Sequence, residues 1–176
     1  MMPPICEGLQ QASRWGMIST KSNQRTPEIM IDRKHIGLEL PPHTAKVEKG
    51  RLKFFAKATG QTDPIYTDED AAIAAGYPSL PAPPTFLFCL DMEVPNPFEM
   101  LDRLGVELGK ILHGEQTFTY HRTVCAGDKI IYRSRVADIF DKKDGALEFI
   151  IKETAVTDED DRKVADLKSV IVVRNA

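Results

Sequence analysis

The fold of this chain is decided by the stretch Thr85-Phe86-Leu87-Phe88-Cys89-Leu90-Asp91-Met92. Its apolar side chains lie almost all round a helix rather than along one stripe, which predicts a helix buried on every side. Pro84 suits the first helical position, because a proline there loses no hydrogen bond. The run Pro95-Asn96-Pro97 ends the pattern. A helix of this kind must be covered by the rest of the chain.

The segment that follows the helix supplies this cover. It predicts four strands, joined by turns at residues 126–128, 141–145 and 158–161: Lys110–Val124, Lys129–Ile139, Ala146–Thr157 and Lys163–Arg174. In the last strand apolar or small side chains recur at every second position from Ala165 to Val173, so one face is buried. Such strands form an antiparallel meander. A curved antiparallel sheet wrapped around a buried central helix is the hot-dog arrangement, an α+β fold.

The segment before the helix predicts shorter elements. Residues 36–47 are extended, and Pro41-Pro42 makes them an edge or a bent strand. A helix over 48–59 ends at Gly60, and a second one over 69–75 is capped by Asp68. A further short helix over 98–104 precedes Gly105.

Composition sets broad limits. The 176 residues are 42% hydrophobic, which suits one compact domain, and the net charge is −3. No basic stripe interleaves with aromatics, so we expect no nucleic acid, and the apolar runs are too short for a membrane span. The three cysteines lack zinc spacing, which favours reduced thiols in the cytoplasm. Residues 1–28 are expected to form a flexible tail, and residues 29–176 a single hot-dog domain.

Several short segments, in order, resemble the MaoC-like hot-dog hydratases and dehydratases, and most of all their N-terminal-type domain. The resemblance runs from about Ile36 to the C-terminus. The segments that carry it are Phe54-Phe55-Ala56-x-Ala58-Thr59-Gly60, Asp63-Pro64-Ile65-Tyr66, Ala75-Gly76-Tyr77, Ala82-Pro83-Pro84-Thr85-Phe86, Leu112-His113-Gly114-Glu115-Gln116-x-Phe118 and Gly127-Asp128. The family adds or removes water across the α,β bond of thioesters of coenzyme A or acyl carrier protein.

Active members of that family carry Asp-x-Asn-Pro-x-His, whose carboxylate and imidazole activate a water. The resemblance places Gln61 at the Asp position, Asp63 at the Asn position and Tyr66 at the His position. Glutamine accepts no proton near pH 7, and a tyrosine with a pKa of about 10 is a poor base. The primary dyad is therefore absent. The resemblance also implies that amides at the start of the buried helix polarise the thioester carbonyl.

Three readings follow. The chain is a dyad-less subunit that pairs with a dyad-bearing hot-dog chain and shapes the pocket for the acyl group. Alternatively, Asp63 with Tyr66 or His113 forms a substitute dyad in a self-sufficient homodimer. The third reading is a non-catalytic acyl-CoA-binding or structural module. Thioesterase action would need a carboxylate near the buried helix, and Asp91 and Glu93 come too late along it.

The candidate catalytic residues are thus Asp63, Tyr66 and His113, and the candidate substrate-binding residues are Gln61, Ala82, Pro83, Thr85 and Gly114. Each has a structural alternative: Asp63 as a turn residue before proline, Tyr66 as a half-buried aromatic, and the proline run as simple rigidity. Strand alternation puts Leu112, Gly114, Gln116, Phe118 and Tyr120 on the helix-facing side and leaves His113 at an interface or in solvent. Arg122, Arg133 and Arg135 are candidates for coenzyme A phosphates. No metal or redox cofactor is implied, because the thioester carrier is part of the substrate.

Overall fold

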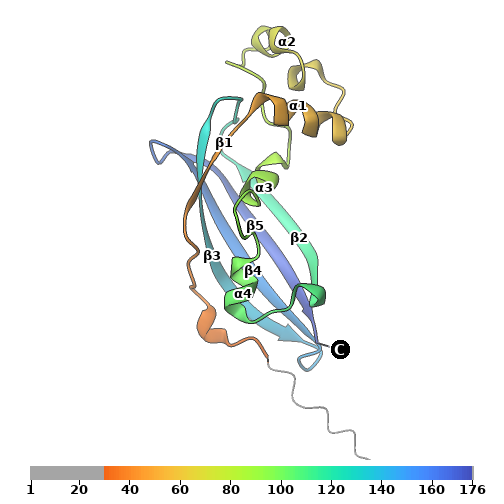
Figure 1. Cartoon of the computed structure of the whole chain (residues 1–176), viewed down its shortest axis with the longest axis vertical. Coiled ribbons are helices and arrows are strands. Elements are labelled where there is room, and N and C mark those ends of the chain that lie inside the picture. Colours follow the sequence, from red (N-terminus) through yellow and green to blue (C-terminus); the bar gives the residue numbers. More distant parts are fainter. Residues whose placement is uncertain (1–29, 176) are drawn as a thin grey trace, which may run out of the picture.

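A five-stranded antiparallel sheet forms the body of the protein (Figure 1). The computed structural model describes residues 30–175, so the predicted tail over 1–28 lies outside the described residues. The strands follow the order β1-β3-β4-β5-β2. Their bounds are β1 His43–Lys46, β2 Ile111–Tyr120, β3 Lys129–Lys142, β4 Leu147–Asp158 and β5 Lys163–Arg174. The predicted meander is confirmed for β3, β4 and β5, which pair in sequence order. It is wrong for β2, which pairs with β5 at the far side of the sheet instead of with β3, so residues 126–128 form a crossover and not a hairpin turn.

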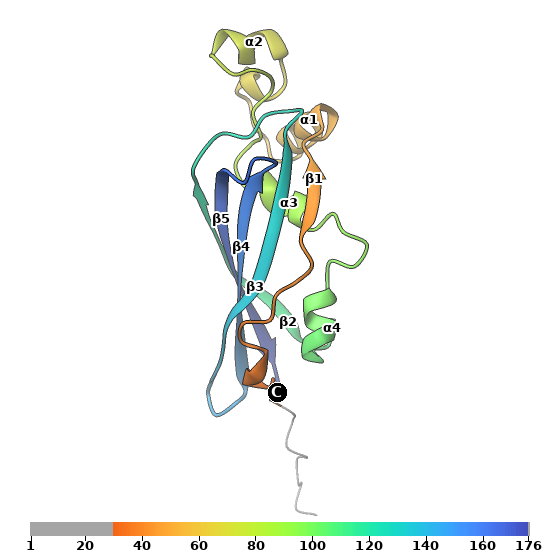
Figure 2. The same ribbon diagram turned by 90° about the vertical axis from the view of Figure 1, so that its left-hand side faces the viewer.

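Four α-helices complete the fold: α1 Lys49–Ala58, α2 Glu69–Ala74, α3 Phe86–Asp91 and α4 Glu99–Leu104. Short 3-10 turns lie at Arg33–His35, Pro64–Tyr66 and Leu108–Lys110. In Figure 2, α3 and α4 lie against one face of the sheet, and no helix within residues 30–175 covers the other. α1 and α2 sit together beyond one end of the sheet (Figure 1). The predicted hot-dog fold, a sheet curved around a central helix, is therefore confirmed.

The core of the half of the sheet nearer α1 and α2, the upper half in Figure 1, is built around α3. Phe86, Leu87 and Leu90 are each at most 2% exposed. The Tyr132 hydroxyl of β3 donates a hydrogen bond of 3.0 Å to the Leu87 carbonyl, which ties the helix to the sheet. Burying each such apolar side chain contributes about 1.5–3 kcal/mol. The all-round apolarity of the sequence thus corresponds to a helix held between the sheet, β1 and α1.

A second core cluster lies under α4. Met100, Leu101 and Leu104 are buried there against Val136 of β3 and Val173 of β5, together with Ile31, Ile139 and Ile150. Gly105 ends the helix in the left-handed region, at φ 68°. This cluster closes the lower half of the same face of the sheet.

Some predicted boundaries are wrong for local reasons. The buried helix begins at Phe86 instead of Pro84. Thr85 has a left-handed φ of 70°, which is not a helical conformation, so the residues before Phe86 cannot belong to the helix. The predicted edge strand before α1 is confirmed, and Pro41-Pro42 divides it: Glu39 forms an isolated bridge with Arg135, and β1 pairs with β3 over His43–Lys46. Asp68 does cap α2, accepting from the amides of Asp70 and Ala71.

The predicted faces of β2 are wrong in its first half. The register against β5 shifts between His113 and Glu115, so Gly114 is an extra, bulged residue. A one-residue shift moves every preceding side chain to the opposite face. His113 therefore lies on the helix-facing side opposite Ile171, and Leu112 and Gly114 do not. A Cβ at Gly114 would meet Val172 Cγ2 at 3.0 Å, so a close approach of the two strands explains this glycine.

No helix within residues 30–175 is long and apolar enough to cross a membrane.

Candidate functional site

A cleft of about 370 Å³ opens beside the start of α3. It is lined by Tyr66, Tyr77, Leu87, the run Pro81–Pro84 and residues 120–124. The wall is braced from two sides, because the Ala82 amide donates to the Val124 carbonyl at 2.7 Å and Pro81 forms a bridge with Cys125. The cleft therefore brings together the candidate residues Tyr66, Ala82 and Pro83.

The loop that carries the altered dyad motif is organised by local hydrogen bonds. The Gln61 amide donates to the Ala56 carbonyl at 2.9 Å, which turns the chain back at the end of α1. Asp63 is exposed, and its carboxylate accepts from the Ile65 amide at 3.1 Å, at the start of the Pro64–Tyr66 turn. Burial, with nearby Asp63 and Tyr77, raises the pKa of Tyr66 above its ordinary value. Asp63 is thus positioned by its own turn, and the raised pKa keeps the Tyr66 hydroxyl protonated at neutral pH.

Three amides at the start of α3 have acceptors. The Thr85 N–H donates to the Tyr120 hydroxyl at 3.0 Å. The amides of Phe86 and Phe88 donate to the carbonyls of Pro83 and Thr85. Burial raises the pKa of Tyr120, although the bond from Thr85 opposes the shift, so the hydroxyl stays neutral. In this chain Tyr120 therefore occupies the Thr85 donor that the resemblance assigns to a thioester carbonyl.

A histidine–carboxylate pair stands at the other side of the cleft. His121 lines the cleft, and its Nε2 lies 2.7 Å from Asp166 Oδ2. The hydrogen bond from His121 lowers the pKa of Asp166, with a smaller contribution from Lys163. Both side chains are more than a third exposed. Sequence reasoning missed this pair, because only the pairing of β2 with β5 brings the two positions together.

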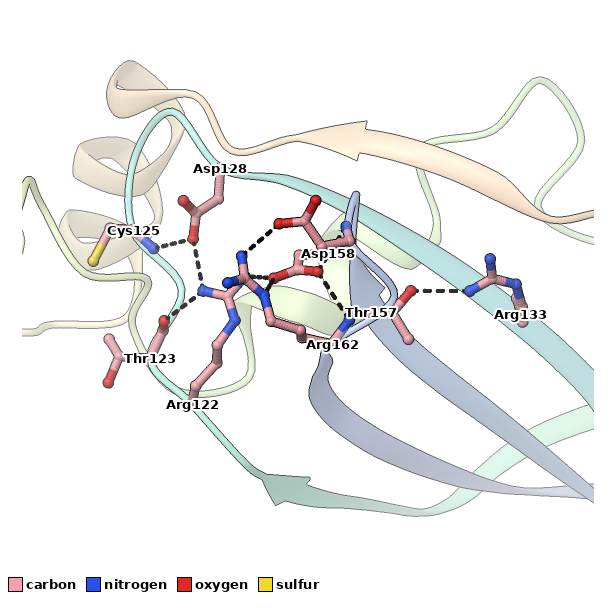
Figure 3. Close-up of polar contacts among 9 residues, drawn as sticks. Arg122, Thr123, Cys125, Asp128, Arg133, Thr157, Asp158 and Arg162 are labelled. Atoms are coloured by element: carbon pink, nitrogen blue, oxygen red, sulfur yellow. Dashed lines mark hydrogen bonds and ion pairs between the residues drawn. The ribbon is translucent and has the colours of Figure 1, made fainter.

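The arginine next to this pair is held by carboxylates (Figure 3). Arg122 donates to Asp128 and to Asp158, each at 3.3 Å, and Arg162 donates to the same Asp158 oxygen at 2.8 Å. Burial of Asp158 raises its pKa, but hydrogen bonds from the Arg162 amide and guanidinium outweigh this, so the pKa lies below its usual value. Arg133 and Arg135 are likewise paired, with Asp161 and Glu153. All three arginines proposed for coenzyme A phosphates therefore already face acidic partners.

A second, smaller cavity of about 140 Å³ lies below α3, between α4 and the sheet. Its walls are mostly apolar: Leu40, Phe88, Met92, Pro97, Phe98, Met100, Leu101, Ile111, Leu112 and Ile171, with His113, Lys152 and Ser169 as polar members. The His113 ring packs 5.3 Å from the Phe88 ring. The structure therefore places His113 in this apolar pocket, apart from the cleft that holds Tyr66. Gln61, Asp63, Thr85 and Gly114 line neither cavity.

A buried carboxylate, Asp91, lies at the end of α3 next to Lys152 and His43. The Lys152 ammonium lies 2.7 Å from Asp91 at the end of α3, and the Asp91 side chain is 4% exposed. His43 Nε2 lies 3.8 Å from the other Asp91 oxygen, and neither of these two atoms has a hydrogen-bond partner within the described chain. The His43 ring stacks on Tyr132 at 4.8 Å. This carboxylate is enclosed and neutralised, which does not suit activation of a water.

Comparison with known proteins gives a consistent result. The family described as FAS1-like, dehydratase domain region, matches residues 34–167. A UPF0336 protein of Saccharopolyspora erythraea is 34% identical over 145 residues, which cover 82% of this chain and 92% of that relative.

Two solved structures share the fold. One is the HadBC complex of Mycobacterium tuberculosis, described as a 3R-hydroxyacyl-ACP dehydratase, with a TM-score of 0.68 at 26% identity. The match covers 78% of this chain and 96% of that one. The other is the ChsH1–ChsH2 complex of the same organism, with a TM-score of 0.62 at 23% identity, covering 77% and 88%.

Proposed function

Because the chain belongs to the FAS1-like dehydratase domain region family, we propose that it is a dyad-less hot-dog subunit of an acyl-thioester hydratase or dehydratase. It works with a second hot-dog chain that carries the intact Asp and His. The observation that carries the proposal is the motif loop. There the resemblance places Gln61 and Tyr66 at the positions of the family's catalytic Asp and His, and the Asp63 carboxylate caps a turn by accepting from the Ile65 amide.

The scarcity of groups in the cleft that can accept or deliver a proton near neutral pH supports a catalytic partner chain. The hydration of an enoyl thioester needs a base to take a proton from water and an acid to deliver one to carbon. Gln61 has no titratable proton, and burial pushes the pKa of Tyr66 further from neutrality. The Thr85 amide donates to Tyr120, so this donor is not directed at a carbonyl in the cleft. We therefore expect the acid and the base of the reaction to belong to the partner chain.

The free edge of the sheet offers a surface for that partner. β2 is a ten-residue strand at the end of the sheet, and within the described residues 30–175 it is paired on one side only. Leu112 and Tyr120 on it are each nearly half exposed. A long open edge pairs readily with the edge of a second chain, which extends the sheet and removes the edge. The described HadBC relative is a complex of two different chains, and we propose a similar heterodimer here in preference to a homodimer.

The apolar pocket below α3 suits the acyl group. Phe88, Met92, Met100 and Ile171 line it, and it adjoins the exposed half of β2 through Leu112 and His113. Apolar walls with few polar groups are typical of sites for hydrocarbon chains. We therefore propose that this chain contributes the acyl-chain wall. The substrate is an enoyl or 3-hydroxyacyl thioester in cytoplasmic fatty acid metabolism, carried by coenzyme A or acyl carrier protein, with no further cofactor.

The His121–Asp166 pair supports a second candidate function. A histidine hydrogen-bonded to a carboxylate at a cleft has the chemistry of a general base, so this chain could hydrate a thioester unaided. Variants decide between the two candidates. In a self-sufficient enzyme, His121→Gln abolishes turnover by the isolated chain.

The direct test is to purify the tagged chain alone and with any chain that co-purifies, and then to measure hydration of crotonyl-CoA and of a longer enoyl-CoA. We expect turnover only with the partner present, and little change on Asp63→Asn, Tyr66→Phe, His113→Ala or His121→Gln. Turnover by the isolated chain that is lost in one of these variants contradicts the proposal. Thioester binding without turnover in either preparation leaves the binding-module reading.

A further inference from the structure

The apolar pocket below α3 has a polar floor, formed by Lys152 of β4 and Ser169 of β5. Both residues line the pocket, and they lie directly opposite each other in the register of the two strands. Side chains in such a pair have their Cβ atoms about 4.5–5.5 Å apart. Ser169 is buried, and the Lys152 side chain is 15% exposed. Two polar groups therefore meet at one point in a pocket whose remaining walls are mostly hydrocarbon.

The Lys152 ammonium has more hydrogen-bond donors than the chain uses. An ammonium group carries three N–H donors and no acceptor. Within residues 30–175 its one hydrogen-bond acceptor is the Asp91 carboxylate, at 2.7 Å. Asp91 also balances the charge of Lys152, and its side chain is 4% exposed. Two donors on a neutralised cation are therefore left for a group in the pocket that Lys152 lines.

The Ser169 hydroxyl, by contrast, is arranged as an acceptor. It donates its own hydrogen to Gln116 Oε1 at 2.5 Å. Gln116 Nε2 donates to the Thr117 carbonyl at 3.3 Å, which orients the amide with its oxygen toward Ser169. A hydroxyl has one donor and two acceptor lone pairs. Because the donor is used, Ser169 offers only its lone pairs to a ligand.

We propose that the polar floor binds a hydroxyl group that the acyl chain carries away from its reacting carbons. The inference rests on the proposed function, in which this pocket holds the acyl chain. A hydroxyl accepts a hydrogen bond from Lys152 and donates one to Ser169, so it uses both groups, whereas an ether or a ketone only accepts. A carboxylate would add a second negative charge beside the buried Asp91, which makes it a poorer match.

The position of the polar floor separates this hydroxyl from the reacting end of the substrate. Tyr120, in the wall of the cleft, pairs with Ala165 of β5, and Ser169 lies four residues further along the same strand. At a rise of about 3.4 Å per residue, the two positions are about 13 Å apart. The reacting carbons adjoin the thioester carbonyl, so they cannot reach the cleft and the floor together. The recognised hydroxyl therefore lies toward the far end of the chain.

The size of the pocket agrees with recognition of a chain end. Its volume is about 140 Å³. One water molecule takes about 30 Å³ of liquid volume, so the pocket has room for about five non-hydrogen atoms. A few polar groups in an otherwise apolar pocket fix the orientation of a ligand and provide its specificity. Lys152 and Ser169 thus distinguish a hydroxylated chain end from a plain one.

The test is a calorimetric binding titration of the full chain, in its complex with the co-purifying hot-dog chain. The ligands are saturated acyl-CoA esters of eight to sixteen carbons, which cannot be hydrated, each as the plain chain and with a terminal hydroxyl, methoxy or carboxylate group. At the best chain length we expect the hydroxylated ester to bind at least about tenfold more tightly than the plain one, which corresponds to about 1.4 kcal/mol. The methoxy ester should bind less tightly than the hydroxylated one, because it cannot donate to Ser169.

Ser169→Ala should reduce the preference for the hydroxylated ester to about threefold or less and leave the Kd of the plain ester within about twofold. A purely structural role of Ser169 would weaken both ligands alike. Ser134→Ala is the matched control, because it removes a similarly buried serine hydroxyl outside this pocket, and it should keep the full preference. Lys152→Met is combined with Asp91→Asn, so that no buried carboxylate loses its cation, and the double variant should lose the preference as well.

Three results would overturn the inference. Plain and hydroxylated esters that bind equally at every length would leave an ordinary hydrocarbon pocket, with the proposed function intact. Tightest binding of the carboxylate ester would make the pocket an anion site. Binding of none of the esters would contradict the proposed function and the inference together. Because the titration needs no turnover, a hydroxyl preference that depends on Ser169 would support the inference even in a complex without hydratase activity.

Discussion

The Thr85 amide donates a hydrogen bond of 3.0 Å to the Tyr120 hydroxyl, so the side chain of one strand satisfies the backbone that enters the buried helix. Thr85 holds a left-handed φ of 70°, which is rare for a β-branched residue. The strained residue is thus tied to β2 at the point where a substrate carbonyl would otherwise find a donor. This relationship fixes the entry of α3 against β2 at the wall of the cleft.

Tyr120→Phe should lower the free energy of unfolding by about 1 kcal/mol, because the Thr85 amide loses its acceptor while the ring and its packing remain. Urea denaturation of the two proteins measures this difference. Tyr66→Phe is a suitable control, since no hydrogen bond of the Tyr66 hydroxyl is seen within residues 30–175. Equal stability of Tyr120→Phe and wild type would mean that water replaces the hydroxyl at no cost.

Gly114→Ala should destabilise the protein by about 1–3 kcal/mol, because the new methyl meets Val172 Cγ2 at 3.0 Å and the Val170 carbonyl at 3.1 Å. Gly50→Ala provides the opposite control. It adds a methyl in open space within α1 and should stabilise the protein by about 0.5–1 kcal/mol. Thermal unfolding of both variants tests the pair. A tolerated alanine at position 114 would contradict the close approach of β2 and β5 at the bulge.

Lys152→Met should cost about 3–5 kcal/mol, because it leaves the Asp91 carboxylate buried without its cation. The methionine keeps most of the length and apolar stem of the lysine, so the loss of charge dominates. Adding Asp91→Asn should recover more than half of the loss, since the remaining group is neutral. Chemical denaturation of the single and double variants forms the comparison. A double variant that is no more stable than Lys152→Met would refute the pairing.

The His43 ring predicts a pH dependence of stability. Burial lowers the pKa of His43, although Asp91 opposes this, and Lys152 lowers it further. Between the folded and the unfolded pKa, the unfolded chain binds the proton and the folded one does not. Stability is therefore lost as the pH falls below about 6.5.

His43→Phe keeps the stacking on Tyr132 and removes the titration. Its stability should fall less steeply than that of the wild type between about pH 6.5 and pH 5, with a difference in slope of at most about 1.4 kcal/mol per pH unit. Parallel curves would show that His43 titrates equally in both states.

The sequence was a good guide to elements with a local signal. The all-round apolarity of 86–91 predicted the buried helix, Asp68 predicted a cap, and the turns at 141–145 and 158–161 predicted the hairpins β3–β4 and β4–β5. The pairing of β2 with β5 was not predicted, because no local signal distinguishes it from pairing with β3. Gly114 permits a bulge or a close backbone approach, but the alternation of residue types in β2 continues through it, so the change of face could not be predicted. Its consequence, the move of His113 to the helix side, depends on the register with β5.

The polar pairs of the site could not be predicted from the sequence either. His121 and Asp166 are 45 residues apart, and Asp91 and Lys152 are 61 apart, so only the strand pairing and the seat of α3 bring them together. The bond from Thr85 to Tyr120 spans 35 residues for the same reason. The proposed loss of the dyad, by contrast, stays a prediction that rests on the residue types at Gln61 and Tyr66 and on the resemblance, and not on geometry.

The most direct test of the central claim is to inactivate the dyad of the co-purifying hot-dog chain, by its own Asp→Asn change, and to measure crotonyl-CoA hydration by the reconstituted complex. The account predicts that turnover falls by at least about a hundredfold, while the Asp63→Asn and His121→Gln variants of this chain keep nearly all of it. Full activity with the inactivated partner, lost on His121→Gln, would show that this chain supplies the base itself.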